Sequence, residues 1–171
     1  MTAQPRLLRQ PGPVQPVRLH ARSGPESCLR LELAPDRTLH EAVVAPLAAR
    51  GIEAAVLTLL SGPWAQLTWC TGVPDPSGER VATYAAPRTV ADALLVAGSA
   101  TLGRGLDGQP LVHAHGVFAA ESEIGGGHLV PEGCVVGAAP TVAFAFAVAG
   151  FAIRQRHDVE TNHFVLEPVD G

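Results

Sequence analysis

The sequence predicts a single-domain α+β fold, with a largely antiparallel sheet and one or two helices. Short apolar segments separated by turns that contain Gly, Pro, Asn or Asp predict many strands. A clear helix start signal precedes one early apolar segment, and strands and helices do not alternate regularly as they would in a parallel sheet. A chain of 171 residues is long enough to bury a sizeable core as one domain.

The first part of the chain predicts strands followed by a helix. Residues 17–33 predict one or two opening strands. Thr38 and Glu41 then have the spacing of a capping box, and Gly51 stands where a left-handed C-cap is expected. Pro46 lies inside this helix and is expected to kink it or to limit it to short pieces.

The middle of the chain predicts strands but leaves one segment open. Residues 52–60 are apolar and partly β-branched, as suits a buried strand. Residues 64–71 and 80–86 flank a turn-rich segment and predict a hairpin. Within residues 89–102, Ala and Leu favour a helix, whereas Gly98 and the short distance to the next turn suit a strand.

The last third of the chain predicts strands only. Residues 111–118 predict a strand, and a turn near residues 121–122 returns the chain through a glycine-rich segment. Residues 133–153 carry no charge, but their alternation of Ala with Val and Phe predicts two buried strand segments rather than a membrane helix. A final hairpin is expected around residues 158–162. Such uncharged strands leave a second apolar surface, which we expect subunit association to bury.

Three histidines suggest a metal site. His113 and His115 are two residues apart on the predicted strand, so their side chains share a face. The hairpin places His128, after Gly125–Gly127, opposite His115 and roughly 7–8 Å from His113. Three neutral imidazoles suit a zinc ion with a fourth position open to water or a ligand. The alternative is that backbone groups satisfy these histidines in a polar sheet.

Other residues near these histidines are candidates for supporting roles. Glu121, Glu123 and Glu132 could act as a general base or accept a hydrogen bond from a ligand histidine, or they could simply be solvated. Cys134 could be a further ligand, although a small buried thiol is the simpler interpretation. Catalytic residues stay unassigned.

Two further pairs of residues admit a functional interpretation. His157 and His163 flank the last turn beside two arginines, where they could bind an anion or belong to a solvated hairpin. Trp64 and Trp69 have opposite strand parity. Their parity argues against a stacking platform and predicts that one of them lies in the core.

Composition argues against direct nucleic-acid binding. The formal net charge is −4, all 12 basic residues are arginine, and 16 residues are acidic, so the basic face typical of such proteins is not expected. Residues 1–16 are expected to form a flexible arm that contains Pro and Arg, ahead of a domain over residues 17–171. The positive charge of the arm could contact phosphate or an acidic protein.

The cysteines and the amino terminus indicate the compartment. Cys28, Cys70 and Cys134 are odd in number and well separated, which is not typical of a disulfide framework or of a paired-cysteine metal site. The first residues lack the apolar segment of a signal peptide. We therefore expect a cytoplasmic protein that does not enter a membrane.

The segment LVHAHGVFAAESEIGGGHLVPEGCVVGAAPTV resembles the PPC (plants and prokaryotes conserved) domain family, also called DUF296. The His-x-His strand, the run Gly126–Leu129 and the run Cys134–Val136 fall in the order of the family. A weaker similarity extends over residues 38–60 and 151–167, so the resemblance covers nearly everything after the proline-rich arm.

The resemblance carries expectations about structure and partners. It implies an antiparallel α+β domain, strand structure for residues 89–102, and a homotrimer with the histidines near a subunit boundary. Plant members bind DNA through a separate AT-hook, which this chain lacks, so the family label "putative DNA-binding" transfers by name more than by residues. Where relatives often place a glutamate after the Cys-Val-Val strand, this chain has Pro140-Thr141.

Two functions are compatible with these observations. The first is a PPC-type metal-binding domain protein with a DNA-binding or regulatory role. The second is a zinc-dependent lyase or hydrolase acting on a small carboxylate or carbonyl compound, because the fold is similar to that of acetolactate decarboxylase, which holds zinc with a comparable histidine set. A structural trimer without a functional metal is a third possibility, so enzyme activity stays open.

Overall fold

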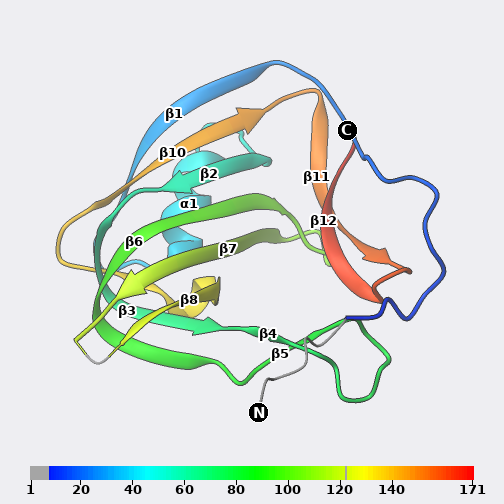
Figure 1. The fold of residues 1–171 in the computed structure, drawn as a ribbon. Coiled ribbons are helices and arrows are strands. Elements are labelled where there is room, and N and C mark those ends of the chain that lie inside the picture. Colours follow the sequence, from blue (N-terminus) through cyan, green and yellow to red (C-terminus); the bar gives the residue numbers. More distant parts are fainter. Residues whose placement is uncertain (1–7, 122) are drawn as a thin grey trace, which may run out of the picture.

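The fold is built on one curved sheet, along which neighbouring strands pair antiparallel (Figure 1). The computed structural model describes residues 8–121 and 123–171. In spatial order the strands are β1 (Glu26–Leu33), β10 (Thr141–Val148), β2 (Ala55–Leu59), β6 (Arg88–Arg104), β7 (Pro110–Ala119), β8 (Ile124–Leu129), β3 (Gly62–Cys70) and β9 (Val135–Val136). This arrangement confirms the predicted α+β class.

Strand β6 curls the sheet back on itself. One part of β6 pairs with β3, another with β2, and β7 pairs along its opposite edge. Because β3 also pairs with β8, the strands β6, β7, β8 and β3 form a closed ring. Residues 89–102, for which helix and strand propensities were evenly balanced, are therefore a strand, as the family resemblance implied. Sheet partners on both edges override the helix preference of its Ala and Leu residues.

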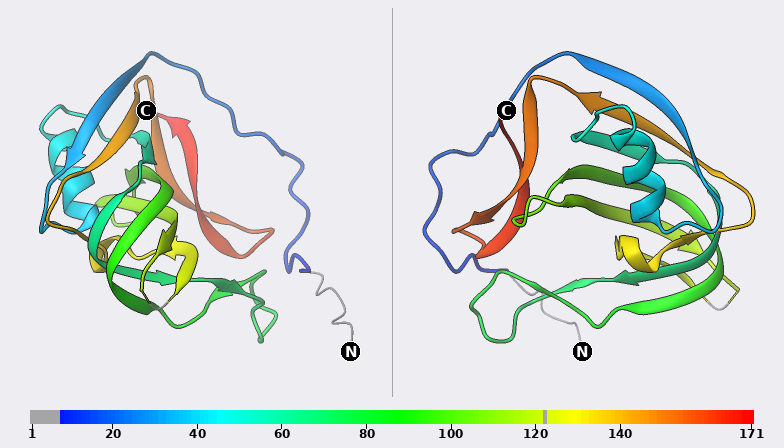
Figure 2. Two further views of the ribbon diagram at one scale, coloured as in Figure 1. Left: turned by 60° about the vertical axis from the view of Figure 1, so that its left-hand side comes forward. Right: turned by 180° about the vertical axis from the view of Figure 1, so that it is seen from behind.

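Helix α1 (Leu39–Ala48) covers one face of the sheet, as the view from behind shows (Figure 2). It buries Leu39, Val43 and Leu47 in a core that β2, β6 and β7 also line. The predicted capping box is present: the Glu41 N–H donates to Thr38 Oγ1 at 3.1 Å, and the Thr38 N–H donates to the Glu41 carboxylate at 3.0 Å. A 3-10 turn, η1 (Pro131–Gly133), packs beside the helix.

Thr38→Ala is expected to destabilise the protein without altering the histidine site. Both hydrogen bonds made by the Thr38 hydroxyl would be lost, and loss of an N-cap side chain typically costs about 1 kcal/mol. Chemical denaturation measures this change. Thr38→Ser keeps the hydroxyl and should retain most of the stability, so an equal loss in both variants would contradict the capping role.

The opening strand begins later in the chain than residues 17–33 predicted. Only Glu26–Leu33 forms a strand, whereas residues 17–25 have no regular structure. Instead, this segment runs beside the hairpin of β11 (Phe151–Asp158) and β12 (His163–Asp170), which stands next to the main sheet (Figure 2). The structure thus has one of the one or two strands that the sequence predicted, after residues 23–25.

Glu160, in the turn of this hairpin, holds the segment in place. Its buried carboxylate accepts the Gln15 N–H at 2.8 Å and an Arg18 guanidinium N–H at 2.7 Å. Arg22 pairs with Asp170 at 2.8 Å. Part of the predicted arm therefore contacts the domain, while Arg6 lies outside the described residues. The boundary between residues 16 and 17 stays a prediction.

Two burial predictions have different outcomes. Cys134 is fully buried and its thiol donates to the Thr68 carbonyl oxygen, with burial raising its pKa to about 11, which confirms a structural thiol. Trp64 and Trp69 are both in the core, at 1% and 6% exposure, so the expectation that one would be outside is wrong. The register of β3 against β9 shifts between Trp64 and Gln66, and this irregularity breaks the strict alternation on which the expectation depended.

Among the described residues, no helix has the length and apolar character that a membrane crossing requires. Residues 133–153 instead contribute β9, β10 and the start of β11. Ala143, Ala145 and Ala147 of β10 face the core, and Val142, Phe144 and Phe146 occupy the other face. The predicted division into buried strand segments is confirmed.

Candidate metal centre

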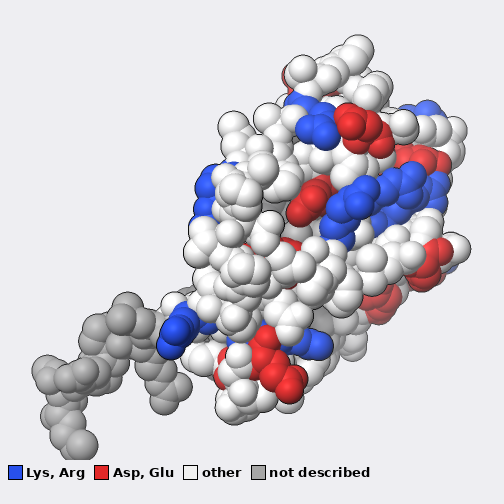
Figure 3. All heavy atoms as spheres, turned by 90° about the vertical axis from the view of Figure 1, so that its right-hand side faces the viewer, with Lys and Arg blue, Asp and Glu red and all other residues white. Residues whose placement is uncertain are grey.

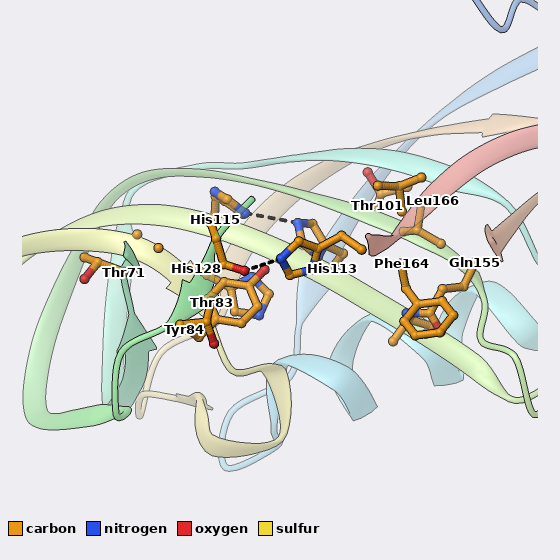
Figure 4. A pocket seen from close by; sticks show the side chains of 16 residues that line it. Thr71, Thr83, Tyr84, Thr101, His113, His115, His128, Gln155, Phe164 and Leu166 are labelled. Carbon is orange, nitrogen blue, oxygen red and sulfur yellow. Dashed lines mark hydrogen bonds between the residues drawn. The ribbon is translucent and has the colours of Figure 1, made fainter. Parts of the chain in front are cut away.

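The three predicted histidines converge on the sheet face opposite α1. His113 and His115 project from β7, while their neighbours Val112 and Ala114 belong to the core on the helix side. His128 of β8 pairs directly with His115, in the predicted register. One potential ligand atom from each histidine lies within 4.8 Å of the other two, and the Nε2 atoms of His113 and His115 are 3.0 Å apart (Figure 4).

Glycines allow β8 to approach its neighbours closely enough to place His128. Gly127 has φ +153°, and a Cβ atom built there would lie 2.4 Å from the Cys70 carbonyl oxygen of β3. At Gly126 a Cβ atom would lie 2.8 Å from the Gly116 carbonyl oxygen of β7. Side chains at these positions would push β8 away from both partners, so the glycine run determines where the third histidine sits.

Burial keeps two of the imidazoles neutral. Desolvation lowers the pKa of His128 to about 4, with smaller contributions from His113 and His115, and desolvation followed by His115 also lowers the pKa of His113. The Nδ1 atom of His128 is buried without a hydrogen-bond partner among the described residues. Neutral imidazoles with free nitrogen lone pairs are the form that binds zinc, so these residues fit a divalent ion.

Acidification of the metal-free protein is expected to lower its stability. The pKa of His128 is about 4 in the folded state and about 6.5 in an unfolded chain. A lowered histidine pKa means that the unfolded state takes up protons first, so stability is full above pH 6.5 and declines as the pH falls toward 4. With allowance for partial solvent exposure, we expect a loss of about 1–2 kcal/mol. Thermal unfolding at several pH values measures it, and His128→Gln should reduce the slope.

The histidines form one end of a cavity of about 650 Å³ (Figure 4). Its walls come from β6, β7 and β8 of the main sheet, from the β11–β12 hairpin, and from a separate two-stranded ribbon of β4 (Gly72–Val73) and β5 (Thr83–Tyr84). The predicted hairpin of residues 64–71 with residues 80–86 is therefore not formed as expected, because only Gly72–Val73 and Thr83–Tyr84 pair and most of β3 pairs with β6. The Tyr84 ring stacks on His128 with centroids 4.8 Å apart and planes inclined by 26°.

His163 belongs to this cavity, which the sequence interpretation missed. It lies on β12, lines the cavity, and its Nε2 atom contacts the Ala82 carbonyl oxygen beside β5. His157, by contrast, is exposed and hydrogen bonds to Asn162 within its own hairpin at 2.9 Å. The sequence held no local signal for His163 or Tyr84, because each reaches the cavity only through contacts between distant segments.

The candidate supporting residues lie away from the cavity. Glu121 is exposed in the turn after β7, Glu123 pairs with Arg88 at 2.9 Å, and Glu132 lies on η1. None of these carboxylates is among the residues that line the cavity, and Cys134 is buried in the core. The structure therefore brings together the three histidines and leaves the glutamates outside.

Several solved structures share this fold. A metal-containing protein from Archaeoglobus fulgidus is 18% identical, with a TM-score of 0.70 over 88% of this chain and 99% of that one. A putative DNA-binding protein from Ralstonia eutropha JMP134 is 19% identical, with a TM-score of 0.63 over 80% and 88%. A plant- and prokaryote-conserved (PPC) protein from Pyrococcus horikoshii is 21% identical, with a TM-score of 0.60 over 86% and 92%.

At the level of sequence, no family model and no curated protein matches the chain. The structural similarity nevertheless extends over most of both chains in each comparison. It agrees with the antiparallel α+β domain that the resemblance implied. The chain therefore has the fold of the plant- and prokaryote-conserved (PPC) proteins.

Proposed function

We propose that this protein is a PPC-type metal-binding domain protein that holds zinc through His113, His115 and His128. The observation that carries the proposal is the convergence of three potential ligand atoms within 4.8 Å of one another. The lowered pKa of His113 and His128 supports it, because protons then compete little with the metal at neutral pH. The metal-containing protein from Archaeoglobus fulgidus, which shares the fold, gives further support.

The proposed role is regulatory binding of a ligand at the open metal position. Direct contact with DNA is less well supported, although two neighbours are named putative DNA-binding proteins. The face that carries β11 and β12 shows a short band of basic side chains with carboxylates on both sides of it, so the basic surface does not extend across this face (Figure 3). Five arginines of the described chain are paired with carboxylates: Arg18, Arg22, Arg30, Arg88 and Arg104.

We further propose that the protein is a homotrimer. Beyond the histidines, the sheet face opposite α1 carries exposed apolar side chains, which association would remove from water. Val56 and Phe146 are direct neighbours across β2 and β10, at 46% and 39% exposure, and Val117 on β7 is 51% exposed. Sedimentation should give three times the monomer mass of 17.7 kDa. A single species at the monomer mass would reject the trimer.

Elemental analysis of protein purified without an affinity tag tests the metal proposal. We expect about one zinc per chain, as three protein ligands and one open position would hold. If the purified protein contains no metal, and if it also fails to retain zinc that is added to it, the histidines have a structural role instead. A duplex-DNA retardation assay at low salt tests direct DNA contact separately, because phosphate contacts dominate nucleic-acid affinity. No retardation there would exclude direct DNA binding.

A metal-dependent lyase or hydrolase is the second candidate, and the cavity beside the histidines favours it. Zinc would supply a Lewis acid for a carbonyl or carboxylate oxygen. Tyr84 and His163 line the same cavity, and the Nε2 atom of His163 contacts the Ala82 carbonyl oxygen. A screen of keto and hydroxy acids tests this function. Turnover that is present in the zinc-loaded protein and lost in His115→Ala would support this function. If the screen finds no such turnover, the protein is not an enzyme of this class.

A further inference from the structure

The histidines and the apolar side chains of β12 lie in different parts of the cavity (Figure 4). Hydroxyl groups from Thr71, Thr83, Tyr84 and Thr101 are distributed around it. The apolar lining comes from Leu111 on β7 and from Phe164, Val165 and Leu166 on β12, next to the uncharged amide of Gln155 on β11. Within residues 8–121 and 123–171, no Asp, Glu, Lys or Arg side chain lines the cavity.

The distribution of charge limits what this cavity can bind. Neutral imidazoles leave the charge of a divalent ion uncompensated, so an anionic group is favoured at the histidine end. A second anionic group at the far end of a ligand would meet Phe164, Leu166 and the uncharged amide of Gln155, and would find no Lys or Arg side chain. Placing a charge beside apolar side chains without a cation in reach is unfavourable, even where the wall is partly open to solvent, as at Phe164. The apolar wall thus discriminates against ligands that are charged at both ends.

The end of the hairpin that carries the apolar wall is anchored to another wall of the cavity. The tip of the β11–β12 hairpin is tied to the segment before β5 by backbone and side-chain hydrogen bonds. The Val81 N–H donates to the Thr161 carbonyl oxygen at 3.0 Å, and the Asn162 side-chain amide donates to the Glu79 carbonyl oxygen at 2.7 Å. His163 adds a contact to the Ala82 carbonyl oxygen. These contacts anchor the hairpin immediately before Phe164, and such support favours a preformed binding surface.

We propose that the cavity selects monocarboxylates that carry an uncharged branched or aromatic tail, with Phe164 and Leu166 as specificity-determining residues. The carboxylate lies at the histidine end and the tail packs against β12. A volume of about 650 Å³ leaves room for such a tail beyond the carboxylate. This inference rests on the proposed metal site and holds for a regulatory ligand as well as for a substrate.

Calorimetric titration of zinc-loaded protein with α-ketoisocaproate and α-ketoglutarate tests the proposal. The two acids share the keto-carboxylate group and are similar in length, but only the second has a distal charge. We expect α-ketoisocaproate to bind at least about tenfold more tightly. Equal binding, or tighter binding of α-ketoglutarate, would overturn the selectivity. Failure to retain zinc before any acid is added is a different result, because it would reject the metal site itself.

Variants of β12 locate the selectivity. Leu166→Arg places a cation on the apolar wall and should shift the preference toward α-ketoglutarate by about tenfold or more, with zinc content unchanged. Val169→Arg adds the same charge on the same strand at a position that does not line the cavity, and should leave the preference as it is. Phe164→Ser is a milder test at a side chain that is 49% exposed, and it should weaken only α-ketoisocaproate. An unchanged preference in both Leu166→Arg and Phe164→Ser would contradict the assignment.

Discussion

His128→Ala is expected to raise the dissociation constant for zinc by roughly a hundredfold or more. Zinc binding to four protein ligands is worth about 10–16 kcal/mol, so the loss of one ligand removes about 3 kcal/mol. His128 is the ligand that joins β8 to β7 at the site, since the other two histidines both come from β7. Competition with a zinc-binding chromophore measures the change in affinity directly.

His157→Ala is the matched control for this experiment. His157 is exposed on β11, bonds only within its own hairpin, and does not line the cavity. Its replacement should leave zinc affinity unchanged. Free imidazole added to His128→Ala should restore part of the affinity if the folded site is intact. Equal zinc affinity in the two variants would show that His128 is not a ligand.

The central part of the candidate site could be predicted because it depends on local geometry. Alternation along β7 determines that His113 and His115 share a face, and the length of the β7–β8 hairpin determines the pairing of His115 with His128. Both rules act within a segment of fewer than twenty residues. They hold regardless of how the rest of the chain is arranged.

The other walls of the cavity could not be predicted in this way. Tyr84 and His163 reach the cavity because the β4–β5 ribbon and the β11–β12 hairpin fold toward the same sheet face. Nothing in the residues next to His163 distinguishes a histidine at a cavity wall from one in a solvated turn. Propensity likewise could not assign β6, since its Ala and Leu residues become strand only through pairing with β2, β3 and β7.

Gly127→Ala is expected to destabilise the fold by about 2–4 kcal/mol and to weaken zinc binding as well. A methyl group there would lie 2.4 Å from the Cys70 carbonyl oxygen and 3.5 Å from the Trp69 ring, and φ +153° is unfavourable for any residue with a Cβ atom. Strand β8 would have to move away from β3, where Cys70 pairs with His128. Displacement of His128 then moves one ligand away from the other two.

Gly51→Ala distinguishes the two possible causes of the destabilisation by Gly127→Ala, which are the strained backbone conformation and the close contact with β3. Gly51 follows α1 with φ +69°, so alanine is strained there too, but no atom lies within 4 Å of the added methyl group. Gly51→Ala should lower the free energy of unfolding by about 1 kcal/mol and leave the zinc affinity unchanged. A larger loss in Gly127→Ala, accompanied by weaker zinc binding, identifies close packing of β8 on β3 as the cause. Equal losses in the two variants would mean that backbone conformation alone requires glycine and that the position of β8 does not depend on this contact.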